Sequence, residues 1–213
     1  MILSATAAPG VFTEVSDAFF HDPFRGRLAE GWNWVREDPE GWRITDSGLE
    51  IRVQPGNMWG GANDARNILI REAPQPEGGS VTVSVHLSNR PTAQYEQVDL
   101  VWYYDDSHMV KIGQELVDGK LSVVMGREER DQCRTIAIHA IEAFVLEVRF
   151  VVRGREIRGE YRVPGESEWH LGGVTDLPVN GSPKVSIQCY QGPAEVEHWA
   201  RLWDLRIESS GGE

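Results

Sequence analysis

The segment Glu96–Gly119, EQVDLVWYYDDSHMVKIGQELVDG, carries the strongest structural signal in this chain. Its first half, residues 97–104, is rich in Val, Leu, Trp and Tyr, and a short polar turn follows it. In residues 110–115 apolar side chains alternate with polar or small ones, and an Asp-Gly pair, typical of tight turns, ends the segment. The pattern predicts two antiparallel strands that bury one face and leave Lys111 and Glu115 on the other.

Short alternating segments separated by turns continue along the rest of the chain. Residues 80–88 place Val and Leu on one face and polar side chains on the other, and residues 144–152 place five apolar side chains on one face. No segment keeps a helical period over three turns, and no repeat or linker divides the chain. The sequence therefore predicts one domain, residues 1–213, with a loose terminus at residues 1–10 and an all-β fold of two packed antiparallel sheets.

The charge of the chain restricts its partners. The net charge is −12, which argues against binding to nucleic acid or to an anionic membrane. The eight Trp residues are unusual, because an indole ring is normally buried or used as a contact surface. We therefore expect a ligand other than a polyanion, contacted in part through aromatic rings.

The two cysteines, Cys133 and Cys189, do not form a disulfide framework, and we expect free, largely buried thiols in a reducing compartment. Residues 1–10 lack the basic and apolar regions of a secretory signal, and no apolar run has the length of a membrane span. The sequence therefore favours a cytoplasmic protein with no membrane partner.

Three segments of the chain resemble a known family. They are the hairpin, with Glu96-Gln97, Tyr103–Asp106 and Val110–Gly113, then ARNILIR at residues 65–71, and FFHDPFRGRLAEGWNW at residues 19–34. Together they resemble concanavalin A-like domains labelled "regulation of enolase", and the β-sandwich that follows the catalytic propeller in some β-xylosidases. The resemblance implies a concanavalin A-like jelly roll over most of the chain, and it is more specific to a fold than to a function.

The concanavalin A-like fold hosts glycosidases, which need two carboxylates at a defined separation. Glucanases of this fold carry Glu-x-Asp-x-x-Glu on one strand, but the one Glu-x-Asp here, residues 129–131, lacks the closing Glu. No catalytic residue is therefore assigned, and an enzyme is the less favoured interpretation. A glycoside hydrolase or lyase with a non-standard site among Glu96, Asp99, Lys111 and Glu115 stays open as an alternative, although Lys111 and Glu115 are expected to form a surface ion pair.

A metal site finds little support in the sequence. The six His residues show no pair at ligand spacing, and neither Cys belongs to a Cys-x-x-Cys motif. Calcium needs only oxygen ligands, for which Asp17, Asp22 and Asp204 are conceivable near the terminal strands. No metal and no cofactor is predicted.

Carbohydrate recognition fits the hairpin better, because sugars stack their C–H faces on aromatic rings and pair their hydroxyls with polar side chains. Strand parity leaves two choices open: either Trp102 and Tyr104 face the ligand, or Tyr103 does so together with Lys111. We predict non-catalytic binding of a carbohydrate or glycan-derived ligand on a concave face, with a protein-interaction module or a homo-oligomer as further alternatives. The predicted ligand-binding residues are Trp59, Arg66, Asn67, Glu96, Trp102, Tyr103, Tyr104, Lys111 and Glu115.

Overall fold

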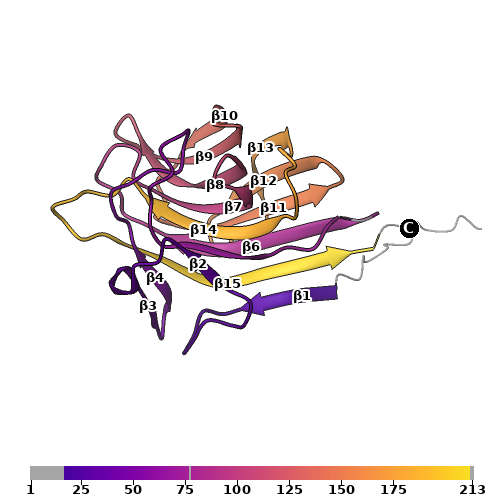
Figure 1. The fold of residues 1–213 in the computed structure, drawn as a ribbon, viewed down its shortest axis with the longest axis horizontal. Helices are drawn as coiled ribbons and strands as arrows, with labels where there is room; N and C mark the ends of the chain where they lie inside the picture. Colours follow the sequence, from indigo (N-terminus) through magenta and orange to yellow (C-terminus); the bar gives the residue numbers. More distant parts are fainter. Residues whose placement is uncertain (1–16, 77, 212–213) are drawn as a thin grey trace, which may run out of the picture.

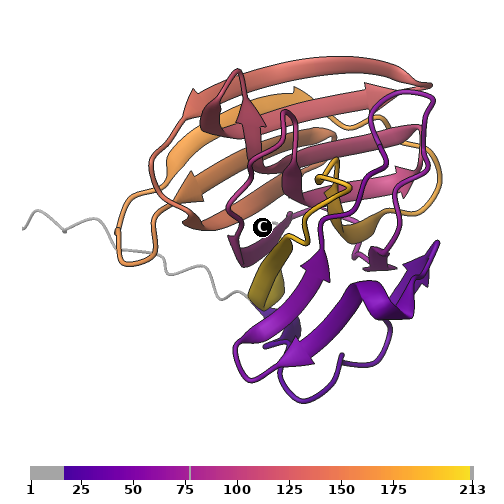
Figure 2. The same ribbon diagram turned by 90° about the vertical axis from the view of Figure 1, so that its left-hand side faces the viewer.

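The computed structural model describes residues 17–76 and 78–211, so the terminus predicted to be loose, residues 1–10, lies outside the described part. Two antiparallel β-sheets are stacked as two layers (Figure 1 and Figure 2). Apart from a short 3-10 helix, η1 (Pro39–Gly41), the described residues contain no helix, and none of them could therefore cross a membrane as a helix. The predicted all-β sandwich of the concanavalin A-like type is confirmed.

The first layer is an eight-stranded sheet. Its order is β13-β12-β11-β6-β15-β4-β3, and β1 pairs with β15 beside this path. A bulge at Asp204, which has a φ of 54°, divides β15 so that its two halves pair with β4 and with β1. The strands are β1 (Asp17–Asp22), β3 (Trp42–Thr45), β4 (Gly48–Arg52), β6 (Ser80–Ser88), β11 (Val145–Arg153), β12 (Glu156–Arg162), β13 (His170–Asp176) and β15 (Trp199–Ser210).

The second layer is a seven-stranded sheet with the order β10-β9-β8-β7-β14-β5-β2. The predicted hairpin forms its centre, because β7 and β8 pair with each other and β8 pairs onward with β9. The strands are β2 (Asn33–Val35), β5 (Ile68–Glu72), β7 (Gln97–Asp105), β8 (His108–Val117), β9 (Lys120–Glu129), β10 (Gln132–Ala140) and β14 (Lys184–Tyr190).

The main hydrophobic core lies between the two sheets and follows the period of two in the sequence. In β6 the predicted inward residues Val81, Val83, Val85 and Leu87 are each at most 1% exposed. The same alternation is found in β11 from residue 146 to residue 152. The prediction that Phe144 is buried on this face is wrong. Phe144 precedes β11, is 39% exposed and packs against the guanidinium of Arg90.

Both cysteines are free, as predicted, but their surroundings differ. Cys189, in β14, is buried in the main core. Cys133, in β10, is exposed, because β10 is the edge strand of its sheet, so the expectation of two largely buried thiols is wrong for this residue.

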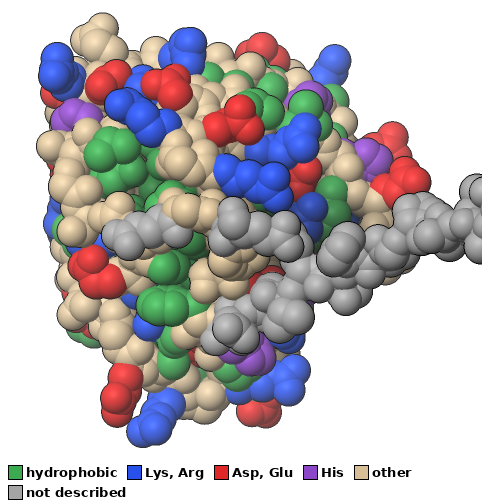
Figure 3. Space-filling model, turned by 90° about the vertical axis from the view of Figure 1, so that its right-hand side faces the viewer, with side chains coloured by type: hydrophobic (Ala, Val, Ile, Leu, Met, Phe, Trp, Pro, Cys, Tyr) green, Lys and Arg blue, Asp and Glu red, His purple; other side chains and the backbone are tan. Residues whose placement is uncertain are grey.

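The surface carries charges of both signs. On the face shown in Figure 3, basic and acidic side chains alternate among small hydrophobic patches. Outward-facing residues of the eight-stranded sheet form ion pairs of this kind, such as Arg149 with Glu160 at 2.7 Å and Arg162 with Glu147 at 2.6 Å. The acidic side chains on this face are therefore mixed with basic ones and do not form a single negative patch.

The stability of the sandwich should depend on the inward residues of β11. Phe150 is fully buried opposite Val83, so Phe150→Ala leaves a cavity and is expected to lower the free energy of unfolding by about 3–5 kcal/mol. Phe19→Ala is the matched control, because Phe19 is 54% exposed and its loss should change stability by no more than about 0.5 kcal/mol. Urea denaturation of both variants measures this difference, and equal losses would contradict the assignment of the core.

Candidate functional site

The outer face of the seven-stranded sheet carries the polar side chains of the hairpin. In β7, residues 98, 100, 102 and 104 point into the main core, so Gln97 and Asp99 point outward. Pairing of β7 with β8 places Gln97 opposite Glu115, and Lys111 lies four residues before Glu115 on the same face of β8. The hairpin therefore gathers two carboxylates, a lysine and an amide on one outer face.

A loop covers part of this face. Residues 54–67, between β4 and β5, rise from the layer of β4 to the level of the other sheet (Figure 2, purple). Met58 and Ala65 of this loop are fully buried against Tyr103 and Met109 of the hairpin. The loop thus forms a second, smaller hydrophobic core on the outside of the sheet.

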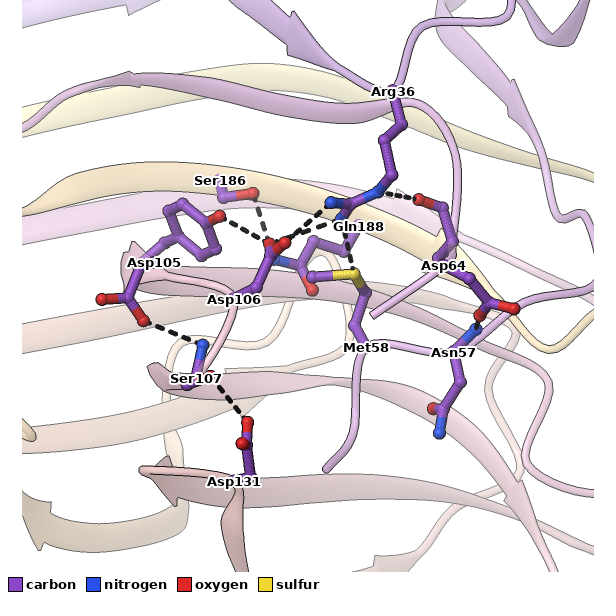
Figure 4. A network of polar contacts seen from close by, with 12 residues as sticks. Arg36, Asn57, Met58, Asp64, Asp105, Asp106, Ser107, Asp131, Ser186 and Gln188 are labelled. Atoms are coloured by element: carbon purple, nitrogen blue, oxygen red, sulfur yellow. Dashed lines mark hydrogen bonds and ion pairs between the residues drawn. The ribbon is translucent and has the colours of Figure 1, made fainter. Parts of the chain in front are cut away.

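Arg36 holds the loop in place, as Figure 4 shows. Its guanidinium donates to Asp106 Oδ2 and to the carbonyl oxygen of Ala65, each at 2.7 Å, and lies 3.0 Å from the sulfur of Met58. The backbone N–H of Asn57 donates to Asp64 Oδ1 at 2.8 Å and closes the loop on itself. Sequence reasoning missed Arg36, because nothing local connects it to an aspartate 70 residues away.

Trp59 occupies the tip of this loop and crosses to β9. Its ring lies over Gly126, where an added Cβ atom would be 2.5 Å from Trp59 Cη2. The backbone N–H of Gly60 donates to Glu128 Oε2 at 3.1 Å, which fixes the tip to the same strand. Gly126 is therefore needed for the indole ring to pack this closely against the sheet.

A pocket of about 430 Å³ remains on the uncovered part of the face. Its volume falls within the range of about 300–1,000 Å³ that is usual for small-ligand sites. Aromatic, amide, charged and aliphatic side chains all contribute to it. The lining residues are Trp59, Tyr95, Gln97, Lys111, Glu115, Val117, Val124, Thr135, Ile138 and Gln191.

Lys111 is the central polar group beneath this pocket. Its Nζ lies 3.0 Å from Glu115 Oε2 and 3.7 Å from Asp99 Oδ2, and it also donates to the amide oxygen of Gln97. The rings of Trp59 and Tyr190 lie 5.1 and 5.8 Å from Nζ, within the range of cation–π attraction. The ammonium group is thus surrounded by acceptors and aromatic rings.

The burial of this cluster corrects the expected surface ion pair. Lys111 is 3% exposed and Asp99 is fully buried. Burial lowers the pKa of Lys111, but the carboxylates of Asp99 and Glu115 outweigh this effect and raise the pKa. Lys111 therefore stays charged, and replacing it would leave two carboxylates without their cation, a change that is strongly destabilising at buried pairs.

Asp99 lies below Lys111 and opposite Gly113. Neither of its carboxylate oxygens accepts a hydrogen bond from the described residues, and burial raises its pKa to about 7 although Lys111 acts in the opposite direction. Gly113 leaves the space that Asp99 occupies, because a Cβ atom there would meet the backbone of Val98 and the Asp99 carboxylate. Only glycine fits at position 113 of the hairpin, because a side chain there would collide with β7.

The structure brings Trp59, Lys111 and Glu115 together and separates the other predicted binding residues from them. Trp102 and Tyr104 point away from this pocket, into the space between the sheets, where the indole N–H of Trp102 is 3.4 Å from the Tyr104 hydroxyl. Both of them line a separate pocket of about 300 Å³. Tyr103 points outward, but the loop covers it and its hydroxyl donates to Asp106 at 2.7 Å. Of the two choices that strand parity left open, Tyr103 is therefore the residue on the outer face, but its ring is not accessible.

Three further predicted residues have structural contacts outside the pocket. Glu96 is fully buried and accepts from the backbone N–H of Thr92 and from His198 Nδ1, each at 2.8 Å. Asn67, at a φ of 54°, accepts from the Asp38 backbone at 2.7 Å, and Arg66 is an exposed residue 3.7 Å from the Asp38 carboxylate. None of the three lines the pocket.

Sequence reasoning missed most of the pocket wall. Gln97 could have been found, since it shares its strand face with Asp99, but Tyr95, Thr135, Ile138 and Gln191 come from strand ends and an edge strand. Their convergence depends on how the strands are ordered, and no local pattern contains that information.

Two of the residues that were considered for calcium, Asp22 and Asp204, make other contacts. Both oxygens of Asp22 accept hydrogen bonds, from Phe24 N at 2.7 Å and from the indole N–H of Trp32 at 2.9 Å. Asp204 pairs with His21 and with Arg206. Within the described part of the chain, no group of three or more His, Cys, Asp or Glu residues is arranged to hold a metal ion.

The sequence and the fold are both similar to parts of known proteins. Residues 21–190 match the family model described as "Beta xylosidase C-terminal Concanavalin A-like domain". The GH43 BlXynB protein from Bacillus licheniformis is 19% identical with a TM-score of 0.78, and the match covers 90% of this chain and 39% of that chain. For xylan beta-1,4-xylosidase from Bacillus halodurans C-125 the identity is 16%, the TM-score 0.76, and the coverage 96% and 41%.

The chain therefore spans about two fifths of the length of these two proteins. A functionally unknown protein from Saccharomyces cerevisiae is 14% identical with a TM-score of 0.62, and the match covers 84% of this chain and 93% of that one. No curated protein sequence matches the chain. At such low identities, the structural matches show that the fold is shared.

The buried Asp99 should make stability depend on pH. Because its pKa is raised from 3.8 to about 7, the folded protein keeps a proton between about pH 4 and pH 7 that the unfolded chain has released. Folding stability is therefore expected to fall as the pH rises through this window. Asp99→Asn removes this titration, so its free energy of unfolding minus that of the wild type should increase from pH 4.5 to pH 8, by on the order of a few kcal/mol.

Urea denaturation of the two proteins at several pH values measures this difference. Contributions from titrating groups that do not interact with Asp99 cancel when the two proteins are subtracted. A difference that stays constant with pH would contradict the raised pKa of Asp99.

Proposed function

The chain belongs to the family of β-xylosidase C-terminal concanavalin A-like domains, and from this membership we propose that it binds a neutral saccharide without hydrolysing it. The observation that carries the proposal is the pocket in which Trp59 stands beside Lys111, Glu115 and Gln97. An indole ring offers a face to the C–H groups of a sugar, and the amide and charged groups offer partners for its hydroxyls. The aromatic surface and the polar groups that a sugar site needs are thus adjacent in this pocket.

The charges of the site favour a neutral ligand. Lys111 contributes one positive charge, which the Glu115 carboxylate at 3.0 Å already balances, and Asp99 lies 3.7 Å away. A carboxylate or phosphate on the ligand would therefore meet no free cation at this position and would be repelled by Glu115. Neutral pentose or hexose units carry no such penalty.

Two observations support binding rather than catalysis. Glu115 is the carboxylate among the described lining residues, whereas hydrolysis of a glycoside uses a pair that flanks the bond. Asp99, the other carboxylate beside Lys111, lies buried below it and is absent from the lining. A role as acid and base in one reaction is therefore disfavoured for this pair.

Linear xylo-oligosaccharides are the first probes to use, because two of the structural matches are described as a xylan beta-1,4-xylosidase and a GH43 protein. The two matches support this choice of probe through the shared fold alone.

Calorimetric titration with xylotriose tests the proposal. Wild-type protein is expected to bind, and Trp59→Ala should weaken binding at least about tenfold, since truncating a central aromatic contact typically removes more than about 1 kcal/mol. Glu115→Gln keeps the size of the side chain and should also weaken binding, through loss of a charged acceptor. Incubation of the wild type with the same sugar should release no xylose.

Trp169→Ala provides the matched control. Trp169 lies on the outer face of the other sheet, between the guanidinium groups of Arg149 and Arg162, and its loss should leave sugar binding unchanged. Thermal unfolding of all variants separates lost binding from lost folding. Absence of binding by a folded wild type across neutral oligosaccharides would overturn the proposed function, and release of xylose would replace it with hydrolysis.

A further inference from the structure

The position of Trp59 divides the outer face of the seven-stranded sheet into two halves. Lys111 of β8 pairs with Gly126 of β9, and Gly126 pairs in turn with Thr135 of β10. These three residues form a row that runs across the strands. Trp59 lies on this row, because its ring packs directly on the backbone of Gly126.

On one side of the row the face is closed. The next pair, Met109 of β8 and Glu128 of β9, is fully buried. Gly60 donates to Glu128, and a Cβ atom added to Gly60 would be 3.8 Å from the sulfur of Cys133, so the loop reaches the edge strand. The covering loop therefore extends across the sheet as far as β10.

On the other side of the row the face forms the pocket. The pair of Gln97 with Glu115 lies four positions along the strands from Lys111, and both residues line the pocket. Tyr95 and Ile138, which are 47% and 51% exposed, stand at its mouth. A ligand can thus enter from this side, while Trp59 and the loop behind it block continuation along the groove.

Resting on the proposed function, we infer that the pocket binds the terminal unit of a sugar chain, or a short oligosaccharide, and not an internal segment of a polysaccharide. An internal segment enters and leaves its site, so it needs a groove that is open at both ends. Here one end is a wall made by Trp59 on Gly126 and sealed by the contact of Gly60 with Glu128. A chain end can meet this wall, whereas a chain that continued along the strands toward Glu128 would collide with it.

The size of the pocket agrees with this inference. A volume of about 430 Å³ lies in the lower part of the range of about 300–1,000 Å³ for small-ligand sites. The wall also requires glycine at position 126, because any side chain there would displace the indole ring. The same aromatic ring therefore supplies the sugar-stacking surface and the end of the site.

A length series distinguishes chain-end binding from internal binding. The probes are xylobiose, xylotriose, xylotetraose, xylohexaose and a long, soluble, unbranched xylan whose chains have been counted by their reducing ends. Calorimetric titration gives the Kd per mole of chains and the number of protein molecules bound per chain at saturation. Chain-end binding predicts a Kd per chain that stops changing once the pocket is filled, and about one protein per chain on the long xylan, since each chain presents one end of the matching kind.

Each other outcome has a separate meaning. A Kd per chain that keeps falling with length, with many proteins on each long chain, would overturn the inference while leaving the proposed function intact. Failure to bind any member of the series would overturn both. The two failures are therefore distinguishable in one set of titrations.

The Trp59→Ala protein tests the wall itself. Removing the indole opens the groove toward Glu128, so the variant should bind short sugars more weakly but should carry more than one protein per long chain at saturation. Trp169→Ala, with its substitution on the opposite sheet, should keep the wild-type ratio. An unchanged ratio for Trp59→Ala would overturn the assignment of Trp59 as the wall.

Discussion

Lys111 carries its charge at a position that is 3% exposed, and a charge removed from water is stable only when opposite charges and acceptors surround it. Much of the outer face of the sheet follows from this requirement. Asp99 and Glu115 must stand on the same face of the hairpin as Lys111, and Gln97 must turn its amide oxygen toward the ammonium group. Gly113 must lack a side chain so that Asp99 fits.

The covering loop contributes to the burial of this charge, because the ring of Trp59 lies 5.1 Å from Lys111 Nζ. Residues 54–67 supply the cover, and Arg36 fastens them by binding Asp106, the Ala65 carbonyl and the Met58 sulfur together. The hairpin turn is thus more than a connection between strands, since its aspartate anchors a loop from another part of the chain. The loop buries its half of the face and leaves the pocket on the other half.

The sequence was sufficient for the fold and insufficient for most of the site, and the hairpin explains why. The alternation in β6 and in β11 predicts an inward face because the other face is polar. In β7, by contrast, every residue from 97 to 104 is buried, since one face meets the core and the other meets the loop at Val101 and Tyr103 and the Lys111 cluster at Gln97 and Asp99. When both faces are covered, the period of two no longer distinguishes inside from outside, so Trp102 and Tyr104 could not be assigned. Glu96 and Asn67 lie outside the pocket, and their polar atoms satisfy backbone groups of neighbouring turns.

The chain shares its β-sandwich with the structural matches. The shared arrangement of strands and the side chains that line the proposed ligand pocket are separate features. At identities of 14–19%, the matches to the GH43 proteins and to the yeast protein preserve the strands and their stacking. The pocket wall comes instead from a loop tip, from residues at strand ends and from an edge strand, which vary most readily within a fold. A function therefore cannot be carried over with the sandwich. The ligand proposed for a domain of this fold depends on whether an aromatic side chain packs on a glycine at the position of Gly126. That contact decides where the groove ends.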